Sequence, residues 1–86
     1  QGATVLGVRG GRRRILATLK REIAAGTPVE FGIAHANAPE DAEWFRRRIG
    51  ESFALARETF VVEATTVLAN HIGEGAVGVA WLAAGS

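Results

Sequence analysis

The segment Pro28–Ala36 constrains the fold most, because large apolar residues alternate along it with polar or small ones. Val29, Phe31 and Ile33 recur at every second position. This period of two predicts a strand with one buried face. Apolar residues follow helical spacing on both sides of the strand, at Ile15, Leu16, Leu19 and Ile23 before it and at Ala42, Phe45, Ile49 and Phe53 after it. We therefore expect two helices that cover the buried face of a sheet.

The remaining β-forming segments predict further strands, at Ala3–Val8, Glu58–Ala64, Thr65–Ala69 and Ala76–Leu82. Gly26 is expected to end the first helix, and Pro39 to begin the second, because proline fits the first helical position. His71–Gly75 is expected to turn the chain between the last two strands. The order β-α-β-α-β, followed by a β-hairpin, predicts an α+β fold, a two-layer sandwich in which two helices cover one face of a mixed sheet. The 86 residues suit one domain, residues 1–86.

Composition excludes several classes of site. The chain has no cysteine, which excludes disulfides, thiolate metal sites and cysteine nucleophiles. Its net charge of +1 provides no overall field for nucleic acid or an anionic membrane. The longest apolar stretch, near Val77–Ala84, is too short to span a bilayer, and no secretory signal is visible, so we expect a cytoplasmic protein without a transmembrane segment. The chain begins at Gln1 and lacks methionine, which favours a processed or excised piece.

Residues Gly73–Gly78 form a literal G-x-G-x-x-G sequence. A dinucleotide site would need a helix after these glycines, whereas a strand-like segment follows, so we expect no nucleotide cofactor. Two readings remain open. The glycines can serve a turn that requires positive φ. Alternatively, they let backbone N–H groups and His71 approach a bound anion, since an imidazole can donate a hydrogen bond to a carboxylate.

The arginine-rich segment Arg9–Arg14 lies between a predicted strand and a helix N-terminus, where free N–H groups and guanidinium groups can bind carboxylate or phosphate. A solvated first turn is the alternative, although its positive charge opposes the helix dipole. RNA binding is disfavoured, because no aromatic residue adjoins the cluster to stack on bases. We therefore expect no nucleic-acid partner.

His35 ends the second predicted strand. Its imidazole can cap nearby backbone groups, or it can join a site at the strand-to-helix junction. The two histidines and the scattered acids show no metal-ligand spacing, and no serine lies in a nucleophile elbow. We expect neither a metal site nor catalytic residues, and hence no enzyme.

Three stretches together carry a resemblance to a known family. Val8–Leu19 is similar to an arginine-rich strand-to-helix passage, and Gly32–Glu43 to a strand that ends in a histidine-alanine pair before an alanine-proline-glutamate helix start. Leu68–Ala80 is similar to a histidine-threonine-glycine-proline-glycine-alanine signature followed by an apolar strand. In order and spacing, the set resembles the C-terminal domain of the DegV family of bacterial fatty-acid-binding proteins.

The resemblance implies a two-domain protein that encloses a long-chain fatty acid and presents its carboxylate to a separate fatty acid kinase. This chain would be the C-terminal domain without its N-terminal domain, and it would contribute one wall and part of the carboxylate site. His71 matches the signature histidine near the head group. Gly73 and Gly75 match the glycines of the turn, and Ala76 matches the alanine after it.

The resemblance also implies a phosphate or partner contact. The family's arginine linked to phosphate transfer matches Arg9 or Arg12, between which the glycine pair 10–11 leaves the register open. Ile72 replaces the usual threonine and so removes a hydroxyl. Glu74 replaces the usual proline and places a negative charge beside the expected carboxylate, a repulsion of about 1 kcal/mol at ~4 Å in water. Apolar residues that could line the acyl chain are Leu68, Val79 and Trp81.

A different class of function stays open beside lipid binding. The domain could be a non-catalytic interaction or regulatory module that pairs with a partner through its sheet. Without an N-terminal domain, its exposed apolar surface would favour self-association.

Overall fold

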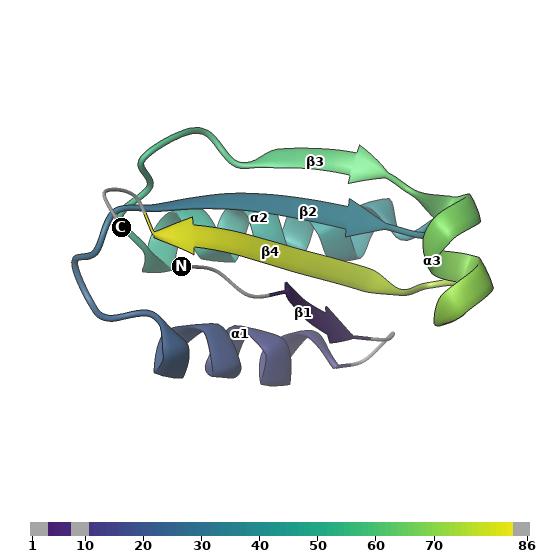
Figure 1. Ribbon diagram of the computed structural model, residues 1–86, viewed down its shortest axis with the longest axis horizontal. Coiled ribbons are helices and arrows are strands. Elements are labelled where there is room, and N and C mark those ends of the chain that lie inside the picture. Colours follow the sequence, from purple (N-terminus) through teal and green to yellow (C-terminus); the bar gives the residue numbers. More distant parts are fainter. Residues whose placement is uncertain (1–3, 8–10, 84–86) are drawn as a thin grey trace.

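A computed structural model of the chain describes residues 4–7 and 11–83. The elements follow the order β1 (Thr4–Gly7), α1 (Arg12–Glu22), β2 (Val29–His35), α2 (Pro39–Ser52), β3 (Phe60–Glu63), α3 (Thr65–His71) and β4 (Val77–Ala83). Figure 1 shows a single sheet, with α1 and α2 running along it and α3 at one end of it. The predicted α+β class with a mixed sheet is confirmed.

Among residues 4–7 and 11–83, four strands form the sheet, in the spatial order β1-β4-β2-β3. β4 is antiparallel to both β1 and β2, with Val77 opposite His35 and Ala83 opposite Val29. β2 and β3 are parallel. Within the part of the chain that the structure describes, β3 therefore forms an edge of the sheet and pairs with β2 alone.

The hydrophobic core lies between the sheet and the two longer helices. Val29, Phe31 and Ile33 of β2 are buried in it, as their alternation predicts. The other core residues come from α1 and its C-cap residue, from α2 and from β4. They are Ile15, Leu19, Ile23, Ala42, Phe45, Ile49, Val77 and Val79. Because α1 and α2 use one face of the sheet, the opposite face lies outside this core.

The predicted strand at Thr65–Ala69 is wrong, since these residues begin α3. Their β-branched side chains favour extended structure locally. However, β2 lies between β3 and β4 in the sheet, so a tight hairpin cannot join those two strands. The chain instead crosses the end of β2, where Leu68 N–H donates to Ala64 and Ile72 N–H donates to Leu68. The observed order is β-α-β-α-β-α-β.

The two predicted helix boundaries have different outcomes. The prediction that Gly26 ends the first helix is wrong, because α1 ends at Glu22 and Gly26 lies in the turn that follows, with a φ of 83°. Pro39 is the first residue of α2, with Glu40 and Asp41 in its first turn. Each of the described helices is too short or too polar to cross a membrane.

Candidate functional site

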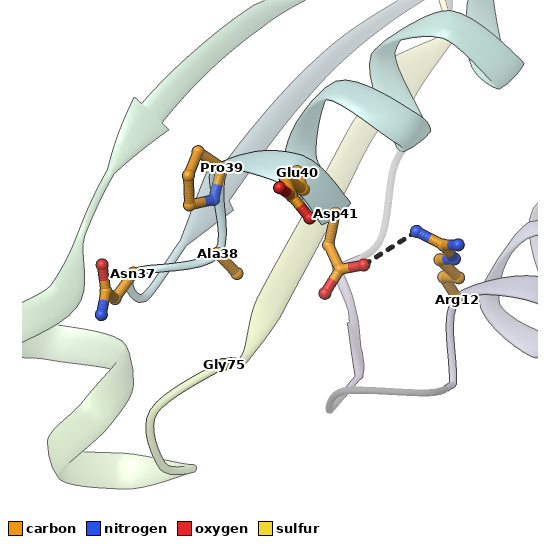
Figure 2. A pocket seen from close by; sticks show the side chains of 7 residues that line it. All are labelled: Arg12, Asn37, Ala38, Pro39, Glu40, Asp41 and Gly75. Carbon is orange, nitrogen blue, oxygen red and sulfur yellow. Dashed lines mark hydrogen bonds and ion pairs between the residues drawn. The ribbon is translucent and has the colours of Figure 1, made fainter.

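A large recess lies where β2 ends and α2 begins (Figure 2). It has a volume of about 580 Å³ and is lined by Arg12, Asn37, Ala38, Pro39, Glu40, Asp41 and Gly75. Asn37 has a φ of 54°, which turns the chain sharply out of the strand and into the helix. Three separate parts of the chain therefore meet here: the start of α1, the β2–α2 junction and the loop before β4.

That loop is the predicted glycine turn, and the structure docks it against the end of β2. Gly75 N–H donates to the carbonyl of Ala36 at 2.9 Å, and Ala36 N–H donates to the carbonyl of Ala76 at 2.9 Å. Gly73 and Gly75 have φ values of 124° and 91°, so the reading that the glycines provide positive φ is confirmed. The backbone of the turn is thus held in place beside the recess.

The four predicted carboxylate-site residues occupy one connection between α3 and β4. His71 is the last residue of α3, and Gly73, Gly75 and Ala76 follow it in the turn. Gly75 lines the large recess. Ala76 is 1% exposed. Their role in holding a carboxylate stays a prediction.

Charge in the large recess is mixed rather than positive. Arg12 and Asp41 point toward each other in Figure 2, and Arg12 Nη1 lies 3.0 Å from Asp41 Oδ1. The guanidinium group also lies over the ring of Trp44, 4.7 Å from its centre. Glu40 contributes a second carboxylate to the lining. An anion bound here would compete with Asp41 for Arg12.

Of the two arginines predicted to contact phosphate or a partner, Arg12 therefore has an intramolecular partner, and Arg9 lies outside the described residues. Glu74 is exposed, and its Oε2 accepts a hydrogen bond from Asn37 Nδ2 at 3.3 Å. This contact directs the Glu74 carboxylate toward Asn37, at the margin of the recess.

His35 caps a nearby backbone group, which is one of the two roles predicted for it. It is 8% exposed, and its Nδ1 accepts a hydrogen bond from Ala38 N–H at 3.0 Å. Since Ala38 is the N-cap residue of α2 and has no side-chain cap of its own, His35 fixes the start of the helix.

The face of the sheet opposite α1 and α2 carries an apolar groove, which lies outside the site predicted from the motifs. One hollow of about 210 Å³ is lined only by apolar residues, Gly32, Ile33, Ala34, Phe60, Val62, Leu68, Gly78 and Ala80. A second hollow of about 180 Å³ shares Gly32, Phe60 and Ala80 with it and extends toward Glu30 and Leu82. We call the two hollows together the open-face groove.

Small residues form the floor of the open-face groove. Gly32 and Ala34 lie on β2, and Gly78 and Ala80 lie on β4 directly opposite, as pairs Gly32–Ala80 and Ala34–Gly78. In part of each strand, these small residues alternate with buried core residues. That alternation of large and small apolar residues is the sequence signal that could have predicted a groove.

The three residues expected to line an acyl chain have different positions. Leu68 lines the open-face groove. Val79 is fully buried in the core on the helix side of the sheet, which excludes it from the groove. Trp81 packs against the core and borders the second hollow.

Within residues 4–7 and 11–83, no group of three or more histidine and acidic side chains could hold a metal ion.

One family model matches the chain. It is described as "Uncharacterised protein, DegV family" and matches residues 2–84. Neither the curated proteins nor the solved structures gave a significant match.

Proposed function

The chain belongs to the DegV family, and from that membership we propose that it is a lipid-binding domain whose open-face groove holds the hydrocarbon part of a long-chain fatty acid. The groove carries the proposal, because its first hollow is lined by apolar residues alone. Burial of an alkyl chain contributes about 0.8 kcal/mol for each methylene group removed from water. A groove of this chemistry therefore suits a hydrocarbon ligand better than a polar metabolite.

The groove and the glycine turn meet at Leu68, which supports a head-group site at the turn. The Leu68 side chain lines the first hollow, and its carbonyl accepts hydrogen bonds from Ile72 N–H at 2.8 Å and Gly73 N–H at 3.1 Å. In the proposal, an acyl chain in the groove extends to the turn, and its carboxylate lies near His71, Gly73, Gly75 and Ala76. Because the N–H groups of Gly73 and Gly75 donate to the carbonyls of Leu68 and Ala36, the proposal assigns the hydrogen bond to the carboxylate to His71.

The open-face groove forms only one wall around a hydrocarbon chain. We propose that a second, N-terminal domain of the natural protein covers it, as the family resemblance implies. The same resemblance suggests that the bound acid is presented to a fatty acid kinase and that this chain itself catalyses nothing. The Arg12–Asp41 ion pair would then have to open before Arg12 could contact a phosphate.

Native mass spectrometry on the full-length natural protein, purified from a bacterium, tests the proposal. We expect a bound mass equal to that of a long-chain fatty acid. His71→Ala should reduce its occupancy if the imidazole contacts the carboxylate. Ala80→Trp should abolish it, because Ala80 is exposed and lies in both hollows.

Val67→Trp is the matched control, since Val67 is 61% exposed on α3 and lies outside the groove. It adds the same bulky side chain without filling the groove and should keep the adduct. A wild-type protein that carries no lipid, and takes up none from added palmitate, would contradict the proposal.

An interaction module that pairs through its sheet is the second candidate, and the exposure of β3 favours it. All four residues of β3 are exposed, and Phe60 and Val62 are 63% and 46% exposed. An apolar edge strand can pair with a strand of another chain. A concentration-dependent dimer in sedimentation experiments, lost in Val62→Lys, would support this candidate, and a strict monomer would count against it.

A further inference from the structure

Phe60 lies where the two hollows of the open-face groove meet. The first hollow extends from it toward Leu68 and Gly78, near α3 and the glycine turn. The second extends the other way, toward Glu30 and Leu82. Gly78 and Leu82 lie toward opposite ends of β4, so the groove follows the strands, and Phe60 stands partway along it.

The Phe60 ring rests on the backbone of Gly32. A Cβ atom added to Gly32 would lie 2.3 Å from Cζ of Phe60 and 2.8 and 2.9 Å from its two Cε atoms. The ring therefore occupies the space that a side chain at Gly32 would fill. Since Gly32 and Phe60 are paired across β2 and β3, the ring reaches from the edge strand over the floor of the groove.

The Phe60 ring can also leave Gly32 without disturbing the core. Phe60 is 63% exposed and does not belong to the hydrophobic core. Displacing it costs the contact with Gly32 but leaves the packing between the sheet and its helices unchanged. A barrier with these properties limits how far a ligand extends without being essential to the fold.

We propose that Phe60 sets the length of acyl chain that the groove accepts. This inference rests on the proposed function. A hydrocarbon chain that starts at the glycine turn fills the first hollow and then meets the ring. A longer chain reaches the second hollow only if the ring leaves Gly32, so the ring selects against it.

Competition binding on the full-length protein tests the inference. The protein is incubated with an equimolar mixture of laurate, myristate, palmitate and stearate, and the bound species are measured by native mass spectrometry. Phe60→Ala should shift the bound population toward the longer acids. For each methylene that newly enters the second hollow, the gain in affinity is up to about fourfold, equivalent to about 0.8 kcal/mol.

Phe60→Leu is a second variant, which keeps an apolar side chain on the edge strand but shortens its reach over Gly32. It should give a smaller shift in the same direction. Val67→Ala, which removes an exposed apolar side chain outside the groove, should leave the length profile unchanged. Thermal unfolding of each variant confirms that it is folded.

The outcomes separate the inference from the proposed function. If the wild-type protein binds fatty acids and both Phe60 variants keep its length profile, Phe60 is not the determinant and the lipid function stands. If the wild-type protein binds none of the acids, the lipid function fails and the inference fails with it.

Discussion

Arg12 and Asp41 join the first turns of α1 and α2 through an ion pair of 3.0 Å. Arg12 alone would oppose the dipole of α1, whose first turn has no acidic residue and whose N-cap, Gly11, has no side-chain cap. Asp41 suits the N-terminus of α2 and at the same time balances Arg12. A pairing between two residues that are 29 positions apart in the sequence thus explains a first turn that is unfavourable by itself.

The first prediction concerns that pair. Asp41→Asn should lower the free energy of unfolding by about 0.5–1 kcal/mol, because the pair is partly exposed and such pairs contribute little more. Urea unfolding of the wild type, Asp41→Asn, Arg12→Gln and the double variant measures the coupling. Additive single effects would contradict a direct interaction.

The second prediction concerns Thr59, which is 6% exposed and precedes β3. Its hydroxyl has no protein hydrogen-bond partner among the described residues. Thr59→Val keeps the shape and removes the buried polar group, so it should raise the free energy of unfolding by about 1 kcal/mol. Thr66→Val, on an exposed residue, should change it by less than about 0.5 kcal/mol. A loss of stability in Thr59→Val would mean that the hydroxyl is bonded.

The third prediction contrasts two glycines. Gly75→Ala should destabilise the fold by about 1–2 kcal/mol, because Gly75 has a φ of 91°, which side chains rarely adopt. Gly50 lies within α2 with open space around it, so Gly50→Ala should stabilise by about 0.5–1 kcal/mol. Thermal unfolding of the two variants should therefore shift in opposite directions. Equal shifts in the unfolding temperature of the two variants would contradict the inference that Gly75 requires a positive φ.

The fourth prediction concerns pH. The hydrogen bond from Arg46 lowers the pKa of Glu43 below its ordinary value of 4.5, and the nearby charges of Arg46 and Arg47 act in the same direction. Because the pKa of Glu43 is lower in the folded protein, the pair stabilises the fold above pH 4.5 and this contribution is lost as the pH falls through the lowered pKa.

Glu43→Gln should therefore reduce stability at neutral pH but not at strongly acidic pH, and added salt should shrink the difference. Urea unfolding at pH values from neutral to strongly acidic measures the free energy of unfolding of each variant. Glu51→Gln, at an exposed acid of the same helix, is the control and should show a smaller dependence. A difference that persists in acid would assign the effect to something other than the charge of Glu43.

Much of the fold follows from local patterns. The alternation in Val29–His35 predicts the central strand and its buried face, and the proline followed by two acids predicts the start of α2. Residues Thr65–Ala69 mislead because their strand preference is local, whereas their helix is imposed by the need to cross β2. Strand order depends on pairing between distant segments, which periodicity does not encode.

Part of the candidate site also follows from local motifs, and part of it depends on the packing of distant segments. The motifs identify the glycine turn and its positive φ, because a turn of that kind needs glycine wherever it lies. They do not reveal that Arg12 pairs with Asp41, since the two residues meet only when α1 packs beside α2. They also do not reveal the open-face groove, whose floor combines small residues from two strands.

By itself, the sequence determined the α+β class, the buried face of β2, the start of α2 and membership of the DegV family, because each depends on residues close together or on motifs in a fixed order. Only the tertiary structure decided which face of the sheet stays open and what lies on it. The Phe60 ring stands over Gly32 because β3 pairs with β2, and that pairing joins residues 28 positions apart. Such contacts arise from packing, which no local pattern specifies.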